Sequence, residues 1–275
     1  MTEPLSLREI AMDTLTKTAR LVVPSLPFGV LFAIASGVLV WGAGVLPEGG
    51  TGFFAFSALT LCALYTHSLF SAAMYRAVLT GQGGLATAAW KLSLAWILVM
   101  VVASIAVTIV VLFFSLIGAS LGVASGNAGQ EITDMTAQMR AGGTFWPLFA
   151  LFVATLLGLF WFAVRLMLFA SASTLRGQVH VFRTWYWTKG HVRTLAPIMV
   201  AFIVLPVAAL SMLAQAINRA VIGTPESSLE LGLSTSLIAL ILMPSAWLGH
   251  AFAASAYERL APGQSINGDQ GSFKR

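Results

Sequence analysis

The chain consists of long apolar stretches separated by short polar ones. Six stretches are nearly free of charged residues. Each is longer than the roughly 20 residues that a helix needs to cross a bilayer core of about 30 Å. They are 21–46, 53–78, 92–123, 145–175, 195–217 and 229–257. This pattern predicts an all-α polytopic membrane protein with six transmembrane helices.

Composition excludes a soluble protein. Of the 275 residues, 58% are apolar and 9% are charged, whereas soluble chains have about 45–50% and 25%. A water-soluble core cannot hide this much apolar surface, and no room remains for a separate soluble enzyme domain. The single cysteine, Cys62, excludes an intrachain disulfide and lies away from other metal-ligand side chains. We therefore expect no metal and no cofactor.

Lysine and arginine are unevenly distributed over the loops. Twelve of the fifteen lie in the N-terminal segment, the second loop, the fourth loop and the C-terminus, which six spans place on one side of the membrane. By the positive-inside rule, that side is the cytoplasmic one. We therefore expect both termini in the cytoplasm and the protein in a bacterial inner membrane.

The predicted domain layout has three parts. Residues 1–20 form a cytoplasmic interfacial segment, which lacks the features of a secretory signal and mixes apolar with charged side chains. Residues 21–257 form the six-helix transmembrane domain, and residues 258–275 form a cytoplasmic tail. A polar outer loop is expected at 123–144, with a short helix possible at 131–139. The loop can be a flexible connection or a recognition element, and the sequence leaves both open.

The even-numbered spans resemble one another. Each has a polar residue inside the membrane, then a run of small residues, a cytoplasmic arginine and a Gly-Gln step. The three copies are, in chain order, His67 to Gln82, Arg165 to Gln178 and His250 to Gln264. The spans are therefore predicted to form three pseudo-repeated hairpins.

Arg165 is the most informative residue for function. It lies about ten residues from the cytoplasmic end of its span, or roughly 15 Å deep at the helical rise. A charge at that depth costs about 2.5–3.5 kcal/mol on insertion scales, and no Asp or Glu lies near the middle of a predicted span. Arg165 can tie helix ends together, bind an anion or lipid headgroup, or line an ion path. These alternatives stay open.

Two histidines lie at nearly the same depth as Arg165. His67 and His250 each precede a cytoplasmic arginine by nine residues, or about 13 Å along a helix. They can share a ligand-binding site with Arg165, or they can be neutral side chains that bridge helices. A metal site is not expected, because two histidines lack a third ligand.

The fourth loop predicts a short cytoplasmic interfacial helix at 177–190. In a helix, Arg176, His180 and Arg183 would share one face. Val179, Phe182 and Tyr186 would form an apolar stripe. Such a helix lies flat at the membrane surface and attracts anionic lipid. It can be a plain anchor or a specific headgroup site. The expected headgroup-binding residues are Arg176, His180, Arg183, Lys189 and Arg193.

Prolines are expected to interrupt the backbone hydrogen bonds of several spans. Breaks in corresponding spans can mark a transport site, although ordinary kinks explain them equally well. The prolines concerned are Pro24, Pro27, Pro197, Pro206 and Pro244.

Enzymatic and nucleic-acid functions are not expected. The sequence has no nucleophile elbow, no zinc-protease motif, no P-loop and no paired intramembrane carboxylates. No catalytic residue is therefore assigned. The basic residues are explained by membrane topology and anionic lipid rather than by nucleic acid.

One stretch is similar to a known family. Arg165, the small residues after it, Gln178 and the Trp187-Thr188-Lys189-Gly190 turn resemble the glycerophosphoryl diester phosphodiesterase membrane domain and its stand-alone bacterial relatives. The resemblance implies a six-helix inner-membrane module that can self-associate. The catalytic barrel of that family is not expected in this chain, so no catalytic residue is carried over.

These observations together predict a non-enzymatic membrane protein that binds or moves an anionic phospholipid or similar amphiphile. Arg165, His67 and His250 would form its intramembrane site. The alternative is a structural or assembly subunit that docks other membrane proteins, or a second copy, through the small residues at 170–173 and 251–256. A small-solute transporter is a third possibility.

Overall fold

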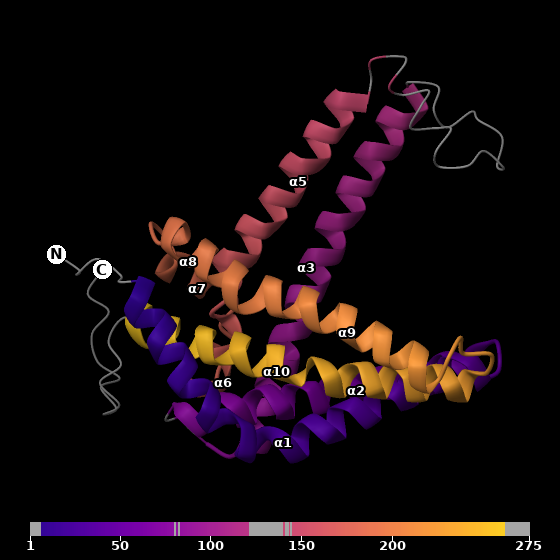
Figure 1. Cartoon of the computed structure of the whole chain (residues 1–275), viewed down its shortest axis with the longest axis horizontal. Helices are drawn as coiled ribbons and strands as arrows, with labels where there is room; N and C mark the ends of the chain where they lie inside the picture. The colour runs from indigo at the N-terminus through magenta and orange to yellow at the C-terminus, as the bar shows by residue number, and fades with distance from the viewer. Residues whose placement is uncertain are drawn as a thin grey trace. The chain divides into compact units, whose positions relative to one another are not determined.

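The computed structural model describes residues 7–79, 81, 83–120, 140, 143 and 145–261. Within these residues every regular element is a helix (Figure 1). In chain order the elements are α1 (Leu7–Val45), α2 (Gly50–Val78), α3 (Leu85–Ser120), α5 (Phe145–Leu166), α6 (Phe169–Leu175), α7 (Arg183–Trp187), α8 (Val192–Met199), the π-helix η2 (Val200–Val204), α9 (Leu205–Val221) and α10 (Ser228–Leu260).

The structure confirms the all-helical class and the six apolar segments of spanning length. They cover Leu7–Val45, Gly50–Val78, Leu85–Phe113, Phe145–Leu175, Val192–Val221 and Ser228–Leu260. Two of them are not single helices. The fourth changes from α5 to α6 through a turn at 167–168, and the fifth passes from α8 through η2 into α9.

The first helix is longer than its apolar stretch. The structure joins residues 7–20 to the first span in one continuous helix, where we expected a separate surface segment. The reason is that one face of this segment is buried, through Ile10, Thr14 and Lys17. Pro24 and Pro27 lie inside α1 and Pro244 inside α10, and both helices continue past them.

The predicted helix at 177–190 is wrong in extent. Only Arg183–Trp187 is helical, and bends and turns occupy the rest. Gly177 and Gly190 have φ values of 60° and 85°, which are left-handed and end a helix. Between them the His180 backbone N–H donates to the Ser173 hydroxyl at 3.0 Å, so it is bonded to a side chain rather than to a helical carbonyl.

Other predictions fall outside the described residues. The outer loop at 123–144 is described only at residues 140 and 143, and the possible helix at 131–139 not at all. The tail is described only to residue 261.

The described residues form two compact units. One unit holds the chain up to Trp96 and again from Val164 onward, and the other holds 97–163. In the first unit, α1 and α10 pack against each other along their length in opposite directions (Figure 1). A capping box starts α10, because the Ser227 hydroxyl accepts from the Glu230 N–H while the Glu230 carboxylate accepts from the Ser227 N–H.

Glycines set how closely α1 and α10 approach. A Cβ added to Gly37 would lie 2.5 Å from the carbonyl oxygen of Gly232, and one added to Gly232 would lie 2.8 Å from the carbonyl oxygen of Gly37. About two turns of α1 away from Gly37 on either side, Gly44 faces Ser228 and Gly29 faces Met243. Small residues at this spacing bring two helix backbones together, as in membrane helix pairs.

Three stretches of the first unit are buried without interruption: 70–75 in α2, 169–175 in α6 and 251–257 in α10. They coincide with the small-residue runs of the three proposed repeats, and α2, α6 and α10 all contact one another. The similar runs therefore meet in one core. The repeat itself remains a prediction.

The second unit contains α3 from Ile97 onward and α5 up to Ala163. Its apolar side chains are exposed around both helices; Ile105, for example, is 57% exposed. Near the start of α5, the Arg140 guanidinium carbon lies 4.8 Å from the centre of the Phe145 ring.

Candidate functional site

Arg165 lies where α5 ends. It is 4% exposed, and α5 stops one residue later. Its guanidinium carbon lies 4.6 Å from the centre of the Trp185 ring, which is a cation–π distance. Its backbone carbonyl accepts a hydrogen bond from the Thr188 hydroxyl at 3.0 Å. The α7 region therefore contacts both the side chain and the backbone of Arg165.

Arg176 makes a similar contact one short helix later. It caps the C-terminus of α6, and its guanidinium carbon lies 4.5 Å from the centre of the Trp187 ring. Its Nε also donates to the Tyr257 hydroxyl at 3.0 Å, which links it to α10. The two tryptophans of α7 thus each face an arginine, one in the fourth span and one directly after it. The sequence alone gave no sign of these arginine–tryptophan contacts.

The segment 177–193 presents a mixed surface. Val179, Phe182 and Tyr186, the predicted apolar stripe, are all exposed, at 40%, 51% and 75%. The basic residues Arg183, Lys189 and Arg193 are exposed as well. No acidic residue occurs in the sequence between Asp134 and Glu226, so this positive charge has no neighbour in sequence to neutralise it.

His180 does not share the exposed basic surface. It is 6% exposed, because the loop folds back at Ser173 instead of continuing as a helix. Burial lowers its pKa below the ordinary value, and the positive charges of Arg176 and Arg183 lower that pKa further. His180 is therefore neutral near pH 7, and the predicted face of Arg176, His180 and Arg183 does not form.

The two histidines that the sequence predicts inside the membrane, His67 and His250, lie in a cluster of aromatic rings in the first unit. His67 lies between Phe32 and Trp96, with ring centres 5.0 and 5.4 Å away. Phe70 lies 6.4 Å from Phe32 and 6.5 Å from His250, so the rings connect both histidines.

His250 is fully hydrogen-bonded. Its Nδ1 lies 2.8 Å from the Ala246 carbonyl, which can only accept, so we assign the proton to Nδ1. Its Nε2 then accepts from the Ser71 hydroxyl at 3.0 Å. This is the bridging role that the sequence left open for the histidines, and it joins α10 to α2.

The structure thus brings His67 and His250 into one cluster and holds Arg165 against Trp185. Phe169 lies between the two places, because its ring centre is 4.8 Å from that of Trp96 and its helix begins just after the turn that follows Arg165. In the part of the chain that the structure describes, no group of three His, Cys, Asp or Glu side chains could hold a metal ion.

An ion-pair network was missed from the sequence. Lys17, which is 7% exposed, pairs with Asp13 at 2.7 Å and with Glu258. Close by in sequence, Arg259 pairs with Glu9 at 2.9 Å. Asp13 and Lys17 are four residues apart, a spacing that indicates a helical pair. The partners on α10 are more than 240 residues away, and no local pattern could indicate them.

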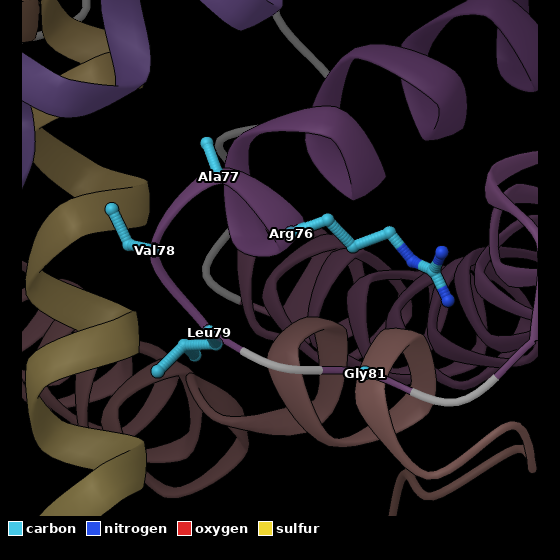
Figure 2. Close-up of a pocket in the computed structure, with 5 residues that line it drawn as sticks. All are labelled: Arg76, Ala77, Val78, Leu79 and Gly81. Atoms are coloured by element: carbon cyan, nitrogen blue, oxygen red, sulfur yellow. The ribbon is translucent and has the colours of Figure 1, made fainter.

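A pocket of about 400 Å³ lies at the end of α2 (Figure 2). Arg76, Ala77, Val78, Leu79 and Gly81 line it. Figure 2 shows the Arg76 side chain extending along the loop that carries Gly81, while Val78 points toward α10. The Arg76 Nη2 donates to the carbonyl of Gly83 at 2.6 Å, so this arginine fixes the loop.

Comparison with known proteins gives no relative: no family model, curated protein or solved structure matches this chain. The resemblance to the phosphodiesterase membrane domain therefore stays a prediction.

Proposed function

We propose that this protein is a non-enzymatic membrane protein that binds an anionic phospholipid at the segment 177–193, on the cytoplasmic face of a bacterial inner membrane. The observation that carries the proposal is the exposed surface of this segment, which combines Val179, Phe182 and Tyr186 with Arg183, Lys189 and Arg193.

Both halves of this surface favour a lipid over a soluble anion. Exposed aromatic and apolar side chains are stable at the headgroup level, where one end of the side chain is apolar and the other is wet. Each basic residue near an anionic membrane contributes about 1 kcal/mol in a salt-dependent way. Three such residues without an acidic neighbour in sequence favour an anionic headgroup over a neutral one.

Arg165 acts in this proposal as a positioning residue. It is buried against Trp185, and its carbonyl receives the Thr188 hydroxyl, so it fixes the segment at both ends of α7. A cation–π contact of this kind contributes about 0.5–2 kcal/mol. The architectural and lipid roles that the sequence left open for Arg165 are then combined: Arg165 holds the surface, and the exposed residues hold the lipid.

The test is mass spectrometry of the protein extracted with its native lipids. The variant Arg183→Gln/Lys189→Gln/Arg193→Gln should lose bound anionic lipid. Its control is Arg8→Gln/Arg20→Gln, which removes two exposed positive charges from α1 instead. Loss of lipid from the control as well would show that general charge, and not this surface, retains the lipid. Unchanged lipid in the first variant would overturn the proposal.

A second variant tests the positioning role. Arg165→Leu should reduce lipid retention and also expose the backbone of 183–188 to hydrogen exchange. Trp185 loses the guanidinium that it contacts, and the residue 165 carbonyl that accepts from Thr188 is no longer held in place by that contact. The triple substitution Arg165→Leu, His67→Leu and His250→Leu asks whether the intramembrane residues contribute more. If it leaves lipid retention and lipid movement in proteoliposomes unchanged, the intramembrane site is excluded.

The assembly-subunit alternative loses part of its support. Its two small-residue faces, at 170–173 and 251–256, are buried within the chain, so a partner would need another surface. Purification in a gentle detergent separates the two functions. A stoichiometric protein partner, without bound anionic lipid, would favour the assembly subunit.

A further inference from the structure

Two ring nitrogens in the aromatic cluster have no hydrogen-bond partner among the described residues. They are Nδ1 of His67 on α2 and Nε1 of Trp96 on α3, and neither atom is accessible to solvent. The centres of the two rings are 5.4 Å apart, with the rings edge to face. The hydroxyl of Ser68, next to His67, is also buried without a partner in the described part of the chain.

Other polar side chains in and near the aromatic cluster are hydrogen-bonded. Buried polar groups in folded proteins are nearly always hydrogen-bonded. His250 uses both of its ring nitrogens, and Ser93, one turn before Trp96 on α3, donates to the carbonyl of Ala89. Thr174 on α6 and Asn218 on α9 also have a buried side-chain oxygen without a partner among the residues that the structure describes, but of these residues only His67 and Trp96 have two such atoms on rings in contact, and one ligand atom between them could satisfy both.

The chemistry of the two nitrogens limits what can bind. The indole N–H only donates, so the ligand atom must be an acceptor, and a neutral imidazole can donate to it or accept from it. The neighbouring rings, Phe32 and Phe169, carry no charge that could balance a phosphate. An uncharged oxygen, such as an ester carbonyl or a hydroxyl, fits these requirements.

The site is close to the α5–α6 turn. Phe169, which contacts Trp96, opens α6 three residues after the end of α5, where Arg165 is held by the α7 region. The first compact unit includes α3 only up to Trp96, and it resumes at Val164, near the end of α5. A glycerophospholipid combines an uncharged acceptor with a charged group in the same way, since its ester oxygens are linked through glycerol to the charged phosphate.

We propose that His67 and Trp96 bind an ester oxygen of a glycerophospholipid whose anionic headgroup is held by Arg183, Lys189 and Arg193. This inference rests on the proposed function and adds the chemical class of the lipid. It also changes the expected role of His67, which contacts the neutral linkage of the lipid and not its charge.

The test compares two lipids that differ only at the linkage. Full-length protein, stripped of lipid in detergent and labelled with ¹⁵N at the indole nitrogens, is titrated with diester phosphatidylglycerol and with its diether analogue. The two share the headgroup, but the diether has no ester carbonyl. We expect the Trp96 indole N–H resonance to move downfield with the diester only, and the diester to bind about two- to tenfold more tightly, as one hydrogen bond would give.

Trp96→Phe keeps the aromatic ring and removes the indole donor, so it should reduce the difference between the two affinities. It also assigns the Trp96 resonance. Trp90→Phe is the matched control, because Trp90 lies on the same helix and is 57% exposed. If Trp96→Phe does not fold, the affinities of the wild-type protein for the diester and the diether decide alone.

The outcomes separate the two proposals. A Trp96 resonance that is already downfield without lipid and does not respond to either lipid would identify a bound water and overturn this inference. So would equal binding of diester and diether by the wild-type protein. In both cases loss of binding in Arg183→Gln/Lys189→Gln/Arg193→Gln would leave the proposed function intact. Failure of the wild-type protein to bind either lipid would overturn both.

Discussion

The pair α1 and α10 differs from the helices of the second unit, α3 beyond Trp96 and α5, in how each is held. Glycines bring α1 and α10 into backbone contact, and ion pairs join their ends. In the second unit the apolar side chains are exposed around both helices, and an added Cβ at Gly158 of α5 would meet nothing within 4 Å.

The difference shows that the chain holds two kinds of apolar helix, and the helices of the second unit, which are the more apolar, are the ones with exposed side chains. Apolar area does not itself drive helices together in a bilayer, since lipid tails are as apolar as the side chains. Association needs close backbone approach or polar partners, which α1 and α10 have. The helices of the second unit carry exposed bulky side chains instead, so substitutions should have very different effects in the two regions.

The largest effect is expected from filling the glycine contact. Gly37→Leu places side-chain atoms against the Gly232 carbonyl and should destabilise the fold by about 3 kcal/mol or more, at the upper end of overpacking costs. Thermal unfolding in detergent measures this. Gly158→Leu is the matched control in α5 and should cost nothing, because leucine has the higher helix propensity. Equal losses at both glycines would contradict the comparison.

Truncating a buried side chain should have the next largest effect. Leu21 on α1 is fully buried, so Leu21→Ala loses its packing contacts and should cost about 2 kcal/mol or more. Ile105→Ala, in the second unit, removes a side chain that lipid replaces and should change stability by less than about 0.5 kcal/mol. A large loss at Ile105 would mean that α3 has a protein neighbour on that face.

Removing the charge of Lys17 tests how much the ion pairs at the ends of α1 and α10 contribute to stability. Lys17→Met leaves Asp13 and Glu258 as two carboxylates with no cation between them. Breaking a fully buried pair costs about 3–5 kcal/mol. Because the side chains of Asp13 and Glu258 are 30% and 46% exposed, we expect about 1–2 kcal/mol after solvent screening. Arg259→Gln, at the more exposed pair, should cost at most about 1 kcal/mol. A double-mutant cycle of Lys17→Met with Glu258→Gln measures the coupling.

The smallest effect is a pH dependence from His180, in the loop between α6 and α7. Its pKa in the folded state lies below the ordinary 6.5, because of burial and the charges of Arg176 and Arg183. Well above pH 6.5 the imidazole is neutral in both states and has no effect on stability. As the pH falls below 6.5, the unfolded state takes up the proton first, so stability decreases until the pH falls below the folded-state pKa.

Unfolding temperatures measured from about pH 7.5 to about pH 5 test this. The pH dependence should be weaker in His180→Gln than in the wild-type protein. His191→Gln controls for the loss of an imidazole elsewhere in the same loop. An identical pH dependence in wild type and His180→Gln would show that His180 does not titrate differently on folding.

The all-helical class and the six apolar segments of spanning length could be predicted because length and hydropathy are local properties. The α1–α10 contact could not, since glycines are common in membrane helices and the facing glycines are nearly 200 residues apart. The end of α5 also has no local sign: Met167 and Leu168, at the turn, are both good helix formers. Contacts of Arg165 with Trp185 and Thr188 hold that turn, and they are visible only in three dimensions.

The candidate site was predicted in part. Exposure of Val179, Phe182 and Tyr186 agrees with the apolar stripe, although the helix that motivated it is reduced to Arg183–Trp187. Periodicity could not reveal that His180 is buried, because this depends on the side chain of Ser173 in the preceding helix. A role for Trp96 was missed altogether, because nothing in the sequence distinguishes it from the other tryptophans.

The pairing of α1 with α10 has a consequence for biosynthesis. Because α1 ends at Val45 and α10 starts at Ser228, the ribosome must translate roughly 180 further residues before the partner of α1 begins to emerge, which takes roughly 10–40 s at ordinary elongation rates. During that time the glycine face of α1 and Lys17 contact lipid, water or the insertion machinery. A nascent chain released before Ser228 would keep five apolar segments and lack the helix that completes its core, which makes it a natural substrate for membrane proteases.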